Sequence, residues 1–204
     1  MSTACRVIVM AKAPLPGHAK TRLIPALGAE GAAALAQRLL ARAVEHALEA
    51  ALGPVELCCA PDPGHSAFRP FAGRQHLCLS RQEDGDLGAR MRRALDRALA
   101  HAARVLLIGT DAPDLDAPML RQAAGALDTH DAVFVPALDG GYALVGLCRP
   151  APSLFDNMAW STARVMADTR TRLAEAGLTH LELAPVRDID EPADLPHVPR
   201  RWLP

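Results

Sequence analysis

Three segments of this sequence carry closely spaced groups that can bind phosphate or a divalent cation. The first, AKAPLPGHAKTRL, places Lys12, Lys20 and Arg22 in a loop rich in proline. Lysine and arginine form charge-assisted hydrogen bonds with phosphate oxygens, and arginine can form two in parallel. Gly17 allows the backbone to come close to a ligand, and Thr21 adds a hydroxyl. The segment therefore predicts a phosphate-binding loop, with a solvent-exposed basic turn as the alternative.

This loop does not have the Walker A pattern of nucleotide-binding proteins. That motif needs glycine at the positions occupied by Pro14 and Ala19. It also needs a helix that starts at once, whereas Pro25 disfavours helical angles at Ile24. We therefore expect a phosphate loop of another kind.

The other two segments, GTDAPDL and RDIDEPADL, supply carboxylates. Asp111 comes three residues after the end of the apolar run 105–108, so a buried strand would present it to the basic loop. A carboxylate in that place can hold Mg²⁺ against phosphate oxygens. The alternative is a turn in which the aspartate binds backbone amides, and this alternative suits Asp114 better. Asp188 or Asp190 could complete the metal site, although Asp190 could equally begin a helix as its N-cap.

The segment EDGDLGARM precedes a strongly amphipathic pattern. Gly88 and Arg90 would lie in the first turn of that helix, where free backbone amides can bind an anion or the edge of a nucleoside. The alternative is a glycine-rich helix start without a ligand. We assign Gly88 and Arg90 to nucleotide binding.

The segment ALDGGYALVGL contains the only tyrosine of the chain, Tyr142. Gly140 and Gly141 before it could let a sugar or another acceptor lie flat against the backbone, and they could also form a plain hairpin turn. Trp160 could line the mouth of the acceptor site, but a structural role is favoured.

Apolar runs and stripes predict the elements that must position these groups. Expected strands and helices alternate along the chain, which is typical of an α/β fold with parallel strand pairing and helices on both faces of the sheet. The expected strands are 6–11, 55–60, 75–79, 105–108, 132–135, 142–147 and 180–184, and the expected helices are 30–52, 87–99, a helix after Asp116 and one from Ser161 or Thr162 to about Ala176. Asp116 and either Ser161 or Thr162 are predicted N-caps, with Pro118 in the first turn after Asp116.

Residues 1–204 are expected to form one domain, because no linker, repeat or low-complexity tract interrupts the pattern. Ligands of such sheets bind beyond the carboxyl ends of the strands. The basic loop and the two acidic segments all follow expected strand ends, so one cleft could collect them.

Composition limits the class of partner. Half of the residues are hydrophobic and the formal net charge is −1, which gives no general electrostatic case for nucleic acid or an anionic membrane. No apolar run approaches the length of a membrane span. The five cysteines form no C-x-x-C pair and suit a reducing cytoplasm. The eight histidines show no zinc-binding spacing, and no G-x-S-x-G motif indicates a hydrolase.

Taken together, AKAPLPGHAKTRL, DLGARM, GTDAPDL, DGGYALVGL, WST and DIDEPADL occur in this order over nearly the whole chain. This joint pattern resembles a bacterial family of small glycosyltransferase-like proteins within the nucleotide-diphospho-sugar transferase superfamily. Some members of that family are described as arsenosugar-biosynthesis glycosyltransferases. The pattern resembles more distantly the phospholactate and molybdenum-cofactor guanylyltransferases.

The resemblance implies a glycosyltransferase-A-type fold, a three-layer α/β/α Rossmann-like mixed sheet. It implies a nucleotide in the cleft, Mg²⁺ or Mn²⁺ held at Asp111, and phosphates facing Lys12, Lys20 and Arg22. Two departures stand out. The guanylyltransferases usually carry a Gly-Gly loop where this chain has residues 13–17, and Glu191 stands where relatives often have threonine.

Two reactions fit this machinery. In glycosyl transfer an acceptor attacks a sugar carbon and a nucleoside diphosphate leaves, whereas in nucleotidyl transfer a phosphorylated acceptor attacks a nucleoside triphosphate and pyrophosphate leaves. In both, a metal ion with Lys20, Arg22 and Asp111 would stabilise charge on the leaving phosphate. We expect a cytoplasmic glycosyltransferase that uses a nucleotide sugar and a small acceptor. The alternatives are a nucleotidyltransferase and a nucleotide-binding module without turnover; no oligomeric state is predicted.

Overall fold

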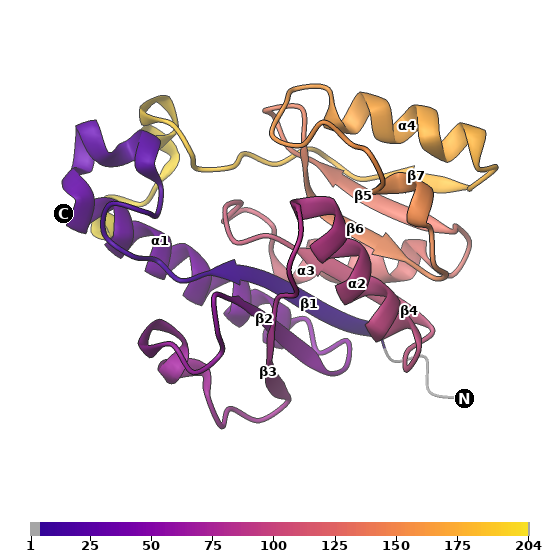
Figure 1. The fold of residues 1–204 in the computed structure, drawn as a ribbon, viewed down its shortest axis with the longest axis horizontal. Helices are drawn as coiled ribbons and strands as arrows, with labels where there is room; N and C mark the ends of the chain where they lie inside the picture. Colours follow the sequence, from indigo (N-terminus) through magenta and orange to yellow (C-terminus); the bar gives the residue numbers. More distant parts are fainter. Residues whose placement is uncertain (1–4, 204) are drawn as a thin grey trace.

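A mixed β-sheet forms the centre of the computed structural model, which describes residues 5–203 (Figure 1). In this part of the chain the sheet has seven strands in the order β3-β2-β1-β4-β6-β5-β7. Strands β1 to β4 pair in parallel, β6 pairs antiparallel with both β4 and β5, and β7 pairs in parallel with β5. The strands are β1 (Cys5–Lys12), β2 (Val55–Ala60), β3 (Leu77–Arg81), β4 (Arg104–Ile108), β5 (Ala132–Pro136), β6 (Tyr142–Leu147) and β7 (His180–Glu182).

Strand β6 departs from the parallel pairing that the alternation of elements predicted. Only residues 137–141 connect β5 to β6, and the Ala137 amide donates to the Gly141 carbonyl across this turn. A parallel connection needs a dozen or more residues, so the short link makes β5 and β6 a hairpin. Uniform parallel pairing is therefore wrong, while the α/β class and the mixed sheet implied by the resemblance are confirmed.

Four α-helices cover the two faces of the sheet within the described residues. One face packs against α1 and α3, through residues such as Leu40 and Leu120. The other packs against α2 and α4, through Leu95 and Leu173. The α-helices are α1 (Ile24–Glu49), α2 (Leu87–Leu99), α3 (Ala117–Ala126) and α4 (Val165–Glu175), and the short 3₁₀ helices are η1 (Thr21–Leu23), η2 (Ser66–Phe71), η3 (Pro152–Leu154), η4 (Pro192–His197) and η5 (Arg200–Trp202). The result is a three-layer α/β/α sandwich.

The helix starts agree with the sequence in one case and differ in another. Asp116 caps α3 as predicted, since its carboxylate accepts a hydrogen bond from the Met119 amide at 2.9 Å. Neither Ser161 nor Thr162 caps α4, which begins only at Val165, and the Thr162 hydroxyl donates instead to the Ala159 carbonyl. That prediction is wrong.

The delayed start of α4 follows from contacts with the β5–β6 turn. The Met166 amide donates to the Gly140 carbonyl at 2.9 Å. A Cβ atom at Gly140 would lie 2.2 Å from the Ala163 carbonyl oxygen. Residues 161–164 therefore lie across the glycine turn and cannot also form the first turn of a helix.

The C-terminal segment crosses the molecule and returns to the start of α1, where it is drawn in yellow beside the indigo helix (Figure 1). Ile189 and Val198 pack there in a small apolar cluster with Leu23, Leu35 and Leu39. This packing brings the acidic segment after β7 next to the basic loop after β1.

We expect Gly146→Ala to destabilise the fold. Gly146 lies on β6, and a Cβ atom there would come within 2.5 Å of Val133 Cγ1 and 2.6 Å of Leu106 Cδ2. Overpacking of this kind costs about 1–3 kcal/mol, to be measured as the free energy of unfolding in denaturant. Gly125→Ala is the control, because nothing lies within 4 Å of its Cβ position in α3 and alanine favours helix. Equal effects of the two changes would contradict this assignment.

Candidate functional site

Two adjoining cavities open at the edge of the sheet where β1 and β4 end and the antiparallel strand β6 begins. Their volumes are about 440 and 520 Å³. Asp111 and Asp190 belong to the walls of both, as do five further residues, namely Leu87, Met91, Gly109, Tyr142 and Ala143. The two cavities therefore meet at a pair of carboxylates.

The first cavity, here called the cationic cavity, lies beside the basic loop. Lys12, Lys20 and Arg90 line it, together with His18 and Gln82. Three permanent cations around a space of this size form a suitable environment for a phosphorylated ligand.

The second cavity, here called the acidic cavity, has the opposite charge. Asp139, Asp188 and Glu191 line it in addition to Asp111 and Asp190, and Arg22 is its one lining Lys or Arg. Tyr142 and Trp160 form an aromatic part of its wall, with their rings edge to face at 6.4 Å.

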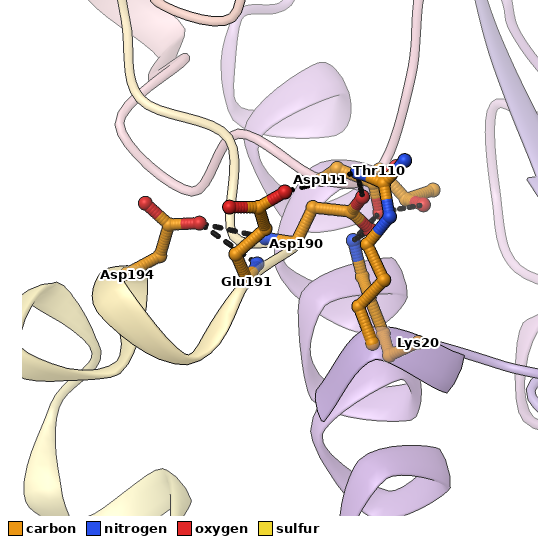
Figure 2. Close-up of polar contacts among 7 residues, drawn as sticks. Lys20, Thr110, Asp111, Asp190, Glu191 and Asp194 are labelled. Carbon is orange, nitrogen blue, oxygen red and sulfur yellow. Dashed lines mark hydrogen bonds and ion pairs between the residues drawn. The ribbon is translucent and has the colours of Figure 1, made fainter. Parts of the chain in front are cut away.

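Lys20 lines the cationic cavity and points toward the carboxylates of Asp111 and Asp190 (Figure 2). Its ammonium nitrogen is 2.6 Å from Asp111 Oδ1 and 3.6 Å from Asp190 Oδ1. The Lys20 side chain is only 6% exposed, whereas those of Asp111 and Asp190 are 54% and 38% exposed. One buried cation thus holds two carboxylates that come from loops far apart in the sequence.

The backbone of Lys20 is left-handed, with φ 47° and ψ 47°. This conformation is unfavourable in free energy for an L-residue with a long side chain, so the surrounding structure must stabilise it. The Lys20 carbonyl accepts from the Leu23 amide at 2.8 Å at the start of η1. The turn therefore directs the lysine side chain inward at the end of the basic loop.

Asp190 is held by backbone contacts that do not involve Lys20. The Ile189 amide donates to the Asp111 carbonyl at 2.8 Å, which ties the two acidic segments together. The Asp194 carboxylate accepts from the amides of Asp190 and Glu191 at 3.1 and 2.9 Å (Figure 2). Glu191, and not Asp190, is the N-cap of η4, so the helix-cap alternative for Asp190 is wrong.

Asp188 faces the acidic cavity in a strongly acidic setting. Burial raises the pKa of its carboxyl group, and the charge of nearby Asp139 raises it further. A half-buried carboxylate with a raised pKa is suited to accept a proton.

Gln82 organises the far wall of the cationic cavity, which was not predicted from the sequence. Its amide nitrogen donates to the carbonyls of Ala11 and Cys58 at 3.0 and 2.9 Å, at the ends of β1 and β2. Its amide oxygen accepts from the Arg90 guanidinium at 2.9 Å. Gln82 therefore holds Arg90 against the strand ends. It directly follows β3, which ends at Arg81, two residues beyond the expected strand 75–79.

Several residues predicted for nucleotide binding lie outside the cationic cavity. Arg22 is 63% exposed, lines the acidic cavity, and pairs with Asp190 at 3.0 Å and Glu191 at 3.3 Å. Gly17 has φ 79°, so the turn requires glycine there. Thr21 begins η1. Neither Gly17 nor Thr21 lines either cavity.

Gly88 also has a packing reason to be glycine. A Cβ atom there would lie 2.5 Å from Trp160 Nε1 and 2.6 Å from the Phe155 carbonyl oxygen. The space beside the first turn of α2 is therefore occupied by Trp160. Nucleotide binding by Gly88 stays a prediction.

The predicted acceptor residues lie at the acidic cavity. Gly141 and Tyr142 line it, and the Gly141 amide donates to Asp139 Oδ1 at 2.8 Å. Gly140 does not line it but forms the turn that packs against Ala163. The turn between β5 and β6 thus forms both the hairpin and part of the wall of the acidic cavity.

The three predicted metal ligands are not gathered into one cluster. Within residues 5–203, no group of three or more histidine, cysteine or acidic side chains is arranged to hold a metal ion. Asp111 and Asp190 are brought together around Lys20, while Asp188 lies in the acidic cavity.

Within residues 5–203, no helix combines the length and the apolar character needed to cross a membrane.

Comparisons with known proteins identify the family and the fold of the chain. Residues 30–162 match the model of a family described as "Uncharacterized protein conserved in bacteria (DUF2064)". No curated protein matches the chain. A proposed nucleotide-diphospho-sugar transferase from Desulfovibrio desulfuricans G20 is 32% identical, with a TM-score of 0.84 over 94% of this chain and 84% of that one.

Two more distant structures share the fold. A nucleotidyl transferase from Methanothermobacter, Mth528, is 16% identical, with a TM-score of 0.62 over 98% of this chain and 97% of that one. Rv0371c from Mycobacterium tuberculosis H37Rv, solved as a complex with manganese, is 18% identical, with a TM-score of 0.56 over 100% of this chain and 99% of that one.

Proposed function

The chain belongs to the bacterial family DUF2064, and we propose that it is a metal-dependent transferase that moves a sugar from a nucleotide sugar to a small hydroxyl-bearing acceptor. Its 32% identity to a proposed nucleotide-diphospho-sugar transferase supports this. The observation that carries this proposal is the pair of cavities of opposite charge that meet at Asp111 and Asp190. A donor phosphate in the cationic cavity would be next to an acceptor in the acidic cavity.

The donor set fits a divalent metal ion that arrives with its nucleotide. Mg²⁺ in proteins is usually bound by one or two carboxylates plus substrate phosphates, with several waters, and not by a complete protein cage. Asp111 and Asp190 supply two carboxylates beside a cavity lined by three cations. These two residues would hold Mg²⁺ or Mn²⁺, which as a Lewis acid stabilises the charge of the leaving phosphate.

The residues of the chain divide the remaining work. The acceptor oxygen forms a bond to the anomeric carbon, the bond from that carbon to the phosphate oxygen breaks, and the nucleoside diphosphate leaves with the electron pair. Lys12 and Arg90 stabilise the phosphate charge from the cationic cavity. The hydroxyl proton passes to a carboxylate of the acidic cavity, for which Asp188 has the more suitable pKa direction.

The acidic cavity favours glycosyl transfer over nucleotidyl transfer. A nucleotidyltransferase of the alternative type takes a phosphorylated acceptor, which the five carboxylates of this cavity would repel, because its one arginine is already paired with Asp190. A hydroxyl acceptor carries no charge and needs a base, which the same carboxylates provide.

The products of turnover test the proposal. The protein with Mn²⁺ would be incubated with nucleotide sugars of each base and a mixture of polyols and amino alcohols, and separately with nucleoside triphosphates and sugar phosphates. We expect release of a nucleoside diphosphate and a glycosylated acceptor in the first mixture. Pyrophosphate release in the second would favour nucleotidyl transfer, and nucleotide binding without either product would favour a non-catalytic module.

We expect Lys12→Met to weaken binding of a phosphorylated nucleotide about tenfold or more, since one charge-assisted contact contributes roughly 1.5–3 kcal/mol. Lys12 ends β1, is exposed, and lines the cationic cavity. Calorimetric titration would measure the dissociation constant, and the nucleoside without phosphates is the control ligand, whose affinity should not change.

The same titration applied to Arg22→Ala tests the prediction, made from the sequence, that Arg22 contacts the leaving phosphates. Loss of nucleotide affinity with unchanged nucleoside affinity would support that contact. If both ligands lose affinity alike, the basic loop supports the fold and does not bind phosphate. If neither Lys12→Met nor Arg22→Ala changes either affinity, the phosphate-loop assignment fails.

A further inference from the structure

Lys20 lies beside Asp111 and Asp190, the two carboxylates proposed above to hold a divalent cation. Its ammonium is 2.6 Å from Asp111 and 3.6 Å from Asp190, and its side chain is nearly buried. Arg22 reaches the other oxygen of Asp190 but is largely exposed. The charge that neutralises the carboxylate pair from inside the protein is therefore that of Lys20.

The backbone segments that carry the two carboxylates are tied together by contacts independent of the lysine. The Ile189 amide binds the Asp111 carbonyl, and Asp194 holds the backbone amide of Asp190. Removal of the Lys20 side chain would thus leave Asp111 and Asp190 close together with less positive charge between them. Two neighbouring carboxylates without such a cation attract a divalent ion more strongly.

We propose that Lys20 competes with the metal ion for Asp111 and Asp190. The Lys20 ammonium leaves these two carboxylates only when phosphate enters the cationic cavity. This inference rests on the proposed function for the identity of the phosphate ligand. Lys20 lines the cationic cavity as well as contacting the carboxylates, so a phosphate group there gives its ammonium an alternative partner. Metal and phosphate then bind together, and each raises the affinity for the other by the same factor.

A purely structural ion pair would behave differently. If Lys20 only stabilised the two loops, its replacement would loosen Asp111 and Asp190 and lower the affinity for metal. The inference requires the opposite sign, a gain of metal affinity on loss of the lysine.

The test is a titration with Mn²⁺ alone, with free Mn²⁺ measured by electron paramagnetic resonance. We expect Lys20→Met to bind Mn²⁺ about tenfold more tightly than the parent protein. Arg22→Met is the matched control, because it removes an exposed cation from the same Asp190 and leaves Lys20 in place. It should change the Mn²⁺ affinity much less.

A second titration adds inorganic pyrophosphate, a probe that does not depend on the nucleotide base. Pyrophosphate should raise the Mn²⁺ affinity of the parent about tenfold or more, and it should raise that of Lys20→Met clearly less. Lys20→Asn serves as a second variant, since asparagine accepts the left-handed backbone at this position and lacks the charge. Circular dichroism confirms that each variant is folded.

The outcomes separate this inference from the proposed function. Mn²⁺ affinity in Lys20→Met and Lys20→Asn that is equal to or weaker than in the parent overturns the inference. A parent protein that binds neither pyrophosphate nor any nucleotide in the presence of Mn²⁺ counts against the proposed function. In that case the comparison with Mn²⁺ alone still decides whether Lys20 competes with the metal.

Discussion

Asp111→Asn is expected to lose metal-dependent nucleotide binding by about a hundredfold or more while the protein stays folded. A metal ion on a phosphate contributes several kcal/mol, and each 1.4 kcal/mol corresponds to a tenfold change. The amide of asparagine keeps the size of the side chain but removes a charged oxygen ligand. The fold should survive, because the Asp111 side chain is about half exposed and its contact with Ile189 uses the backbone carbonyl.

Nucleotide titrations with and without Mn²⁺ would measure this effect. Asp114→Asn is the matched control, since Asp114 lies in the same loop but lines neither cavity. We expect the control to retain the metal-dependent part of the binding energy. Unchanged metal-dependent affinity in Asp111→Asn would remove Asp111 from the metal site.

Asp188→Asn is expected to lower kcat about a hundredfold with little change in the affinity for the donor nucleotide. General base catalysis contributes roughly 10²- to 10⁴-fold, and an asparagine cannot accept the proton. Asp188 lies in the acidic cavity and not among the cations, so the contacts with the donor phosphates should persist. Steady-state rates and nucleotide titrations together separate the two effects.

Glu191→Gln is the control for this second prediction. Glu191 lines the same cavity, but it is well exposed and already pairs with Arg22. Its replacement should change kcat far less. If Asp188→Asn and Asp139→Asn both leave kcat unchanged, proton transfer does not involve this cavity.

Local patterns in the sequence predicted most of the fold. The apolar stripe of residues 87–99 became α2, and Leu40 and Val44 pack α1 against the sheet. Asp116 caps α3 because a cap depends on residues within one turn of each other. Such features are decided over a few neighbouring positions, which is the range in which sequence patterns are informative.

The features that were missed depend on contacts between distant segments. The direction of β6 follows from the length of a five-residue turn, and the failure of Thr162 as a cap follows from packing on Gly140. Residue types correctly suggested that Lys20, Asp111 and Asp190 lie in one cleft. Their direct pairing could not be read from the sequence, because it depends on the bond between Ile189 and Asp111.

The Ile189–Asp111 hydrogen bond has a consequence for how the protein is made. About 80 residues separate its two partners, and β7, which leads into the second acidic segment, is the last strand along the described chain. At synthesis rates of about 5–20 residues per second, Asp111 is made roughly 4–16 s before Asp190. During that interval the nascent chain already contains the basic loop, yet it has only one of the two carboxylates that Lys20 holds. A ribosome-bound chain halted before β7 therefore lacks Asp190, one of the two carboxylates proposed to hold the metal ion.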